Sequence, residues 1–155
     1  TCRCLRRRGD ENMILDVLKQ FIEEECPLVS GKKIKVNYLG EKPQSYTVDT
    51  VPANPVVRKY PDGGSLRQYL FVFASREFYD AQVWSNLDVM AFYEAFSDWI
   101  DEVNRTGMLP DLGEHFSALR FEVVSGGYLF KAESGDARYQ IQCKLLYEKE
   151  GVFLR

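Results

Sequence analysis

The residues best suited to acid–base or nucleophilic chemistry are few in this sequence. His115, in the segment GEHFSA, is the only histidine and, by residue type, the only ready general base. The chain has no Gly-x-Ser-x-Gly elbow, and no Ser or Cys stands in another recognisable nucleophile motif. We interpret His115 as a structural or surface residue. We therefore predict no catalytic residue and expect a protein that is not an enzyme.

The candidate ligands for a metal or a cofactor are equally sparse. The four cysteines are Cys2, Cys4, Cys26 and Cys143, and their spacing does not give the clustered pairs of a typical zinc site. We expect them to be reduced thiols with structural or incidental roles. The glycines after Asp62 lack the Gly-x-x-x-x-Gly-Lys pattern of a phosphate-binding loop and predict a turn. The sequence predicts no metal and no cofactor.

Cationic and aromatic residues gather around one proline- and glycine-rich segment and the strand that follows it. Such a combination occurs in nucleic-acid grooves, and it would equally suit an acidic surface on a neighbouring subunit. The net charge of −3 gives no general attraction to nucleic acid, and we expect no direct sequence-specific binding. Exposed aromatic residues are also enriched at protein interfaces. Our candidate subunit-interface residues are Arg58, Lys59, Tyr60, Arg67, Phe78, Tyr79 and Trp84.

Composition indicates one folded domain. The chain has 155 residues, 45% of them hydrophobic and 14% aromatic, which is enough to bury a sizeable core. No apolar run approaches the roughly 18 residues of a membrane span, and no secretory signal is visible. We expect a soluble protein made in a cytoplasm, with no membrane partner.

The first half of the chain predicts one helix and three strands. Apolar residues at helical spacing predict a helix over residues 11–25, and alternating patterns predict strands over 33–38 and 46–51 that pair as a hairpin. A long arm of about 14 residues then leads into a central strand over 67–74, which is apolar on both faces. We expect this arm to reach a neighbouring subunit.

The second half predicts a longer helix followed by strands. Aromatic and aliphatic residues recur at three- and four-residue spacing over 86–105, with Ser85 as the expected N-cap and Gly107 as the left-handed stop. Strands are expected over 119–123, 128–132 and 137–147, with Gly126-Gly127 breaking the first run from the second. The predicted class is α+β, with a mainly antiparallel sheet of about five to six strands and two helices packed on one face.

The amino-terminal segment differs from the rest. Residues 1–12 contain four arginines in the first eight positions and no hydrophobic periodicity, and Met13 follows directly. Our hypothesis is that 1–12 is a translated leader or an extended gene start, disordered and outside the fold. The alternative is a basic arm that binds nucleic acid. We expect a single domain over 13–151 and a short tail over 152–155.

Several segments together resemble a known family. They are VPANPVVRKYPDGGSLRQYLFVFASREFYD, FYEAFSDWI, SGGYLF and ARYQIQCKLLY, and the similarity covers Met13 to about Gly151. They resemble tail terminator, or minor capsid and tail-completion, proteins of long-tailed phages and prophages of Gram-positive bacteria. The motifs are structural, and no residue inherits a catalytic role from them.

The resemblance implies a virion protein of the head–tail junction. It implies a homo-oligomeric ring, commonly a hexamer, that caps the finished tail tube and joins it to the head connector. The expected partners are thus further copies of the chain, the major tail-tube protein and the head–tail connector protein. Another connector or stopper subunit, or a small enzyme that uses His115, are the alternatives.

Overall fold

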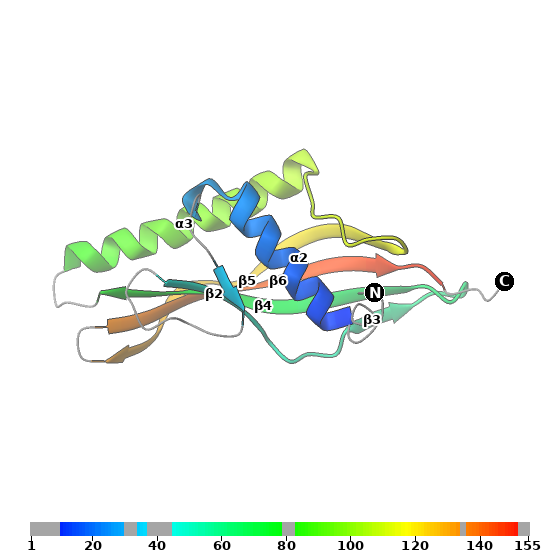
Figure 1. The fold of residues 1–155 in the computed structure, drawn as a ribbon, viewed down its shortest axis with the longest axis horizontal. Coiled ribbons are helices and arrows are strands. Elements are labelled where there is room, and N and C mark those ends of the chain that lie inside the picture. Colours follow the sequence, from blue (N-terminus) through cyan, green and yellow to red (C-terminus); the bar gives the residue numbers. More distant parts are fainter. Residues whose placement is uncertain (1–9, 30–33, 37–44, 79–82, 134–135, 152–155) are drawn as a thin grey trace, which may run out of the picture.

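The computed structural model describes residues 10–29, 34–36, 45–78, 83–133 and 136–151 (Figure 1). Its elements, in chain order, are α2 (Asp10–Glu25), the 3-10 turn η1 (Pro27–Val29), β1 (Ile34–Val36), β2 (Ser45–Thr50), β3 (Val56–Lys59), β4 (Ser65–Phe78), α3 (Val83–Thr106), β5 (Phe116–Glu133) and β6 (Asp136–Lys149). The strands form one open sheet in the order β1-β2-β4-β6-β5, and the sixth strand, β3, pairs with β4 outside this order. The predicted α+β class with a mainly antiparallel six-stranded sheet is confirmed.

The predicted hairpin of the first two strands is wrong. β1 pairs with β2 in parallel, with Ile34 opposite Tyr46 and Val36 opposite Val48. Alternation of apolar and polar residues predicts which face of a strand is buried, but it carries no information on strand direction. The intervening residues 37–44 lie outside the described residues.

The segment predicted to be a long arm towards a neighbouring subunit pairs with the edge of its own sheet. The amide of Val51 donates to the Leu70 carbonyl at 2.9 Å, and the amide of Gln68 donates to the Pro55 carbonyl at 2.8 Å. β3 then pairs with the beginning of β4, with a register shift after Val56. Prolines have no amide hydrogen to give to a ladder, so they are tolerated at an edge strand. The segment therefore forms a projecting hairpin at one end of the sheet (Figure 1).

The last two strands are longer than predicted. β5 runs without interruption from Phe116 to Glu133, and four register shifts against β6 absorb its extra residues. The Gly126-Gly127 pair lies within one of these shifts, so the predicted break is wrong and the pair belongs to a β-bulge. Gly127 is also where β5 approaches α3, because a Cβ atom there would lie 2.3 Å from the Cβ of Tyr93.

The long helix ends as predicted but starts earlier. α3 begins at Val83, which places Ser85 inside the helix and makes the predicted N-cap wrong. At the other end Gly107 has φ 74° and donates its amide to the Val103 carbonyl at 3.0 Å, which confirms the predicted left-handed stop. α2 begins at Asp10, so residues 10–12 of the hypothetical leader are helical.

Aromatic side chains join both helices to one row of β4 residues. Phe96 of α3 stacks on Phe73 with 4.6 Å between ring centroids. Phe21 of α2 stacks on Phe121 of β5, which meets Phe71 edge-on. Phe71 and Phe73 are two residues apart on β4 and share one face, so the helices and that face enclose the core. We call the opposite side of the sheet the far face.

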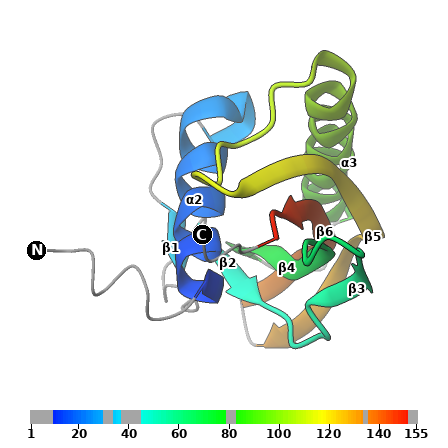
Figure 2. The same cartoon turned by 90° about the vertical axis from the view of Figure 1, so that its right-hand side faces the viewer.

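The outer edge of β5 is partly covered by a side chain of α3. The Asn104 amide group donates to the Phe121 carbonyl and accepts from the Phe121 amide, both at 2.8 Å. Asn104 thus reproduces the two bonds that a further strand would make. In Figure 2 the helix lies above this curved edge strand.

Candidate interaction surfaces

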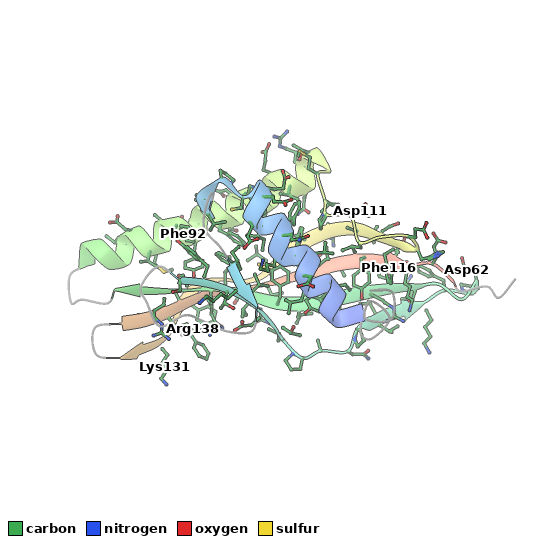
Figure 3. The ribbon with its side chains drawn as sticks, viewed as in Figure 1. Asp62, Phe92, Asp111, Phe116, Lys131 and Arg138 are labelled. Carbon is green, nitrogen blue, oxygen red and sulfur yellow. The ribbon has the colours of Figure 1, made fainter. Side chains whose placement is uncertain are left out.

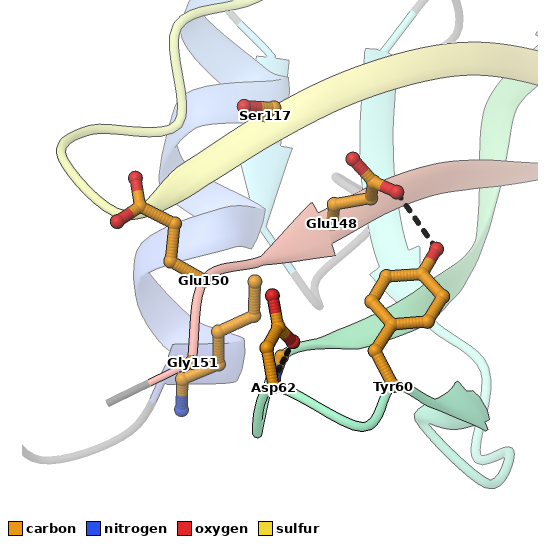
Figure 4. Close-up of a pocket in the computed structure, with 8 residues that line it drawn as sticks. Tyr60, Asp62, Ser117, Glu148, Glu150 and Gly151 are labelled. Atoms are coloured by element: carbon orange, nitrogen blue, oxygen red, sulfur yellow. Dashed lines mark hydrogen bonds between the residues drawn. The ribbon is translucent and has the colours of Figure 1, made fainter. Parts of the chain in front are cut away.

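The hairpin end of the sheet contains a polar cavity of about 370 Å³ (Figure 4). Its carboxylates come from the β3–β4 turn and from the end of β6. The Tyr60 hydroxyl donates to Glu148 at 2.7 Å, which raises the pKa of the Tyr60 phenol, and the Gly64 amide donates to Asp62 at 2.8 Å. These bonds tie the turn to β6. No group of three or more His, Cys, Asp or Glu side chains in the described part of the chain could hold a metal ion.

The structure brings four of the predicted interface residues to this end. Arg58 and Lys59 are exposed on β3, and Tyr60 begins the turn. Arg67 is half-buried at the start of β4, where its Nε donates to the Ser65 hydroxyl at 2.9 Å. All three predicted cations, Arg58, Lys59 and Arg67, therefore lie on the paired segments of β3 and β4.

The other three predicted residues do not join this group. Phe78 ends β4, opposite Asp136, at the far end of a 14-residue strand from Ser65. Tyr79 lies outside the described residues, as does the side chain of Trp84, whose backbone is in the first turn of α3. The seven candidates thus divide between opposite ends of the sheet and do not form one patch.

His115 connects the ends of the last two strands. Its backbone has φ 73°, and its carbonyl accepts the Glu150 amide at 2.7 Å. The imidazole Nδ1 lies 3.4 Å from the Glu150 carboxylate, and 68% of the His115 side chain is exposed. This open position on a strand junction agrees with a surface role.

The far face carries a connected set of polar side chains. Arg138 donates to the Asp49 carboxylate and, through Nε, to the Gln140 side chain, each at 3.0 Å. Gln140 in turn donates to the Tyr128 hydroxyl at 2.7 Å. The Arg138 side chain is only 23% exposed, and these hydrogen bonds fix the position of its guanidinium on β6.

Cations outnumber carboxylates among the described side chains of the far face. Register places Arg76 directly opposite Arg138, and Lys131 opposite Arg138 on the other side. Lys144 and Arg120 both pair with Glu122. Among the side chains that the structure describes, the register places seven basic ones on this face, namely Lys35, Arg58, Arg76, Arg120, Lys131, Arg138 and Lys144, and the acidic side chains Asp49, Glu122 and Glu148.

An exposed aromatic ring lies among these cations. Phe130 is 56% exposed, and the Arg138 guanidinium lies 5.4 Å from the centre of its ring. Figure 3 shows Lys131 and Arg138 on the side of the sheet away from Phe92, which packs between α3 and the strands. We call Phe130, Lys131 and Arg138 the Phe130 patch.

The helices carry the opposite charge. Each has a single basic residue, Lys19 in α2 and Arg105 in α3. Their acidic residues are Asp10, Glu11, Asp16, Glu23, Glu24 and Glu25 in α2, and Asp88, Glu94, Asp98, Asp101 and Glu102 in α3. A chain with a net charge of −3 is therefore strongly divided into an acidic helix layer and a more basic sheet.

A groove of about 140 Å³ lies between the two helices. Its apolar base includes Phe21 and Trp99, whose ring centroids are 5.6 Å apart, and Met108, which is 60% exposed. Glu25 and Glu102 add carboxylates to its lining. The remaining lining residues are Val103 and Thr106. We call this cavity the helix groove.

The two cysteines in the described residues are structural. Cys26 and Cys143 are both buried and unbridged. Burial raises the pKa of the Cys143 thiol to about 12 and also raises that of Cys26. A neutral buried thiol is a poor nucleophile and a poor metal ligand, in agreement with the sequence-based interpretation. Cys2 and Cys4 lie outside the described residues.

The Phe130 patch and the helix groove were not predicted from the sequence. Phe130 follows Leu129 inside an expected strand, and simple alternation assigns one of any two neighbours to the core. The register shift between Leu129 and Lys131 changes that assignment, and the sequence gives no clear sign of it. The helix groove depends on the proximity of α2 to α3, which no local sequence pattern predicts.

No protein-family model matches this chain, and no curated protein matches it in sequence. None of the helices in the described ranges is both long and apolar enough to cross a membrane. The observations that bear on function are therefore the fold class, the geometry of the two surfaces and the family resemblance of the sequence segments.

Proposed function

We propose that this protein is a structural subunit of a long-tailed phage or prophage, and that it works as a tail terminator. Copies of the chain assemble into a ring, with six as the expected number. The ring caps the finished tail tube and joins it to the head connector. The protein is accordingly located at the head–tail junction of the virion.

One observation carries this proposal: each chain has two unlike and complementary surfaces. The helix layer is acidic, whereas the far face is rich in cations and exposes Phe130. A closed cyclic assembly requires that every subunit offer one surface to each neighbour, and the two surfaces must fit one another. Charge complementarity of this kind favours specific association and fixes its orientation.

The segments that resemble tail-completion proteins supply the particular assembly. They include all of β3 and β4, residues 92–100 in the middle of α3, residues 125–130 of β5 and most of β6. The two surfaces support the proposed self-association. The tail tube and the head connector as partners follow from the resemblance.

The proposal is tested with particles from the phage or prophage that encodes the chain. Deleting the gene should leave filled heads separate from tails, and the purified protein added to such a lysate should bind tail ends, as seen by negative-stain electron microscopy. A connector or stopper subunit would instead bind the heads. Normal joined particles without the protein would refute the proposal.

A further inference from the structure

We propose that neighbouring copies bind head to tail, with the Phe130 patch of one copy seated in the helix groove of the next. The inference rests on the proposed self-assembly and names the two surfaces that perform it. The occupant of the groove is therefore a second copy of this chain.

The Phe130 patch has the properties of a binding anchor. Phe130 exposes 56% of its surface, yet its ring is covered on one side by the Arg138 guanidinium. Arg138 is fixed in turn by its bonds to Asp49 and Gln140. An aromatic ring that is already held in place loses little conformational freedom on binding, which is a common property of interface hot spots.

The helix groove offers the matching chemistry. Phe21, Trp99 and Met108 give it an apolar base, and its volume of about 140 Å³ is on the scale of one aromatic side chain. Glu25 and Glu102 lie at its lining, where Lys131 and Arg138 of the neighbour would meet them. Arg105 already pairs with Glu102 at 2.6 Å, so Glu25 is the more available carboxylate.

The end of α2 also favours an external cation. Its last turn contains Glu23, Glu24 and Glu25 and no basic residue. Carboxylates at a helix C-terminus are repelled by the helix dipole, and a cation placed there is attracted by both. Glu23 is engaged with Lys19 and with the Ile34 amide, whereas the charge of Glu25 remains at the groove.

The two surfaces lie on opposite sides of the sheet, which determines the kind of assembly. A patch on one side that binds a groove on the other cannot close as a two-fold dimer through the same contact. Such a head-to-tail contact adds one subunit after another until the assembly closes as a ring. The same arrangement would attract subunits through opposite charges, so raised ionic strength weakens it.

The first experiment changes the anchor alone. Phe130→Ser in the full chain should lower the association constant of self-assembly about 10- to 100-fold, as expected for an aromatic side chain that is no longer buried. Val124→Ser is the matched control, because Val124 is 50% exposed on the same strand and lies outside the patch. Sedimentation equilibrium gives both constants, and circular dichroism checks the fold.

The second experiment exchanges one charge pair. Lys131→Glu and Glu25→Lys should each weaken assembly, and the double variant should recover most of the loss because the pair is restored with its signs reversed. Simple additive weakening in the double variant would overturn the contact. Equal effects of Phe130→Ser and Val124→Ser on self-assembly would also overturn it. So would a result in which the patch and groove variants weaken the binding of tail-tube protein but leave self-assembly unchanged.

The two proposals fail in different ways. If the unaltered chain forms rings that join tails but these variants assemble normally, the head-to-tail contact is wrong and the terminator function stands. If the variants behave as expected but the rings bind neither tails nor heads, the contact stands and the terminator function is wrong. A chain that remains monomeric overturns both.

Discussion

Replacing Gly127 by alanine is the most direct perturbation of the contact between α3 and the sheet. A Cβ atom at this position would lie 2.3 Å from the Cβ of Tyr93 and 2.6 Å from its Cγ. Carbon atoms in contact are normally about 3.5–4.0 Å apart. The helix and β5 would therefore have to separate by more than about 1 Å.

The cost follows from what that separation disturbs. Overpacking of this kind typically costs about 1–3 kcal/mol. The Tyr93 hydroxyl, which lies 2.6 Å from the Ser75 hydroxyl, would also be displaced from its buried partners. Replacing glycine by alanine restores about 0.4–1 kcal/mol by restricting the unfolded chain. We expect Gly127→Ala to lower the free energy of unfolding by about 1–3 kcal/mol.

Urea denaturation followed by circular dichroism measures this change, and Gly126→Ala is the matched control. No atom lies within 4 Å of a Cβ built at Gly126, so that variant should be neutral or slightly more stable. In thermal unfolding the Gly127 variant should lose about 2–4 °C per kcal/mol. If both variants unfold at the same urea concentration, the close approach of α3 and β5 is wrong.

Three further predictions concern buried groups. Tyr93→Phe should cost about 1–3 kcal/mol in urea denaturation, because the Ser75 hydroxyl loses a buried partner; an unchanged midpoint would contradict this bond. Asn104→Ala should speed hydrogen exchange of the Phe121 amide, measured by NMR, and no change there would exclude the edge-covering role. Cys143, with its pKa raised to about 12, should resist iodoacetamide at pH 8 until the protein unfolds. Burial favours the neutral form of this thiol, so its contribution to the free energy of unfolding is complete below about pH 8.5 and is lost as the pH rises towards 12. In the Cys143→Ala variant the free energy of unfolding should not show this loss.

The sequence predicted the elements of the fold well because periodicity reflects burial. The pattern that ends at Gly107 gave the end of the long helix, and the alternation after Asp136 gave nearly all of β6. Direction and register are set by partners distant in the sequence. That is why the parallel pairing of β1 and the attachment of the segment after Val51 to the sheet edge were not predicted.

The interaction surfaces were predicted only in part. The cations near Arg58 were recognised because they are close in sequence, and the structure keeps them together at one end. Phe130 and Arg138 come from different strands and meet through a register shift. The helix groove depends on how α2 crosses α3, which no local pattern contains. Surfaces assembled from separate elements require the fold before they can be seen.

The measurement that tests the account most directly is sedimentation velocity of the full chain over a range of concentrations, at low and at high salt. We expect one closed oligomer of uniform size at low salt, which dissociates as ionic strength rises because unlike charges hold its subunits together. A monomer at every concentration and salt level would contradict the central claim that this molecule works by binding its own copies.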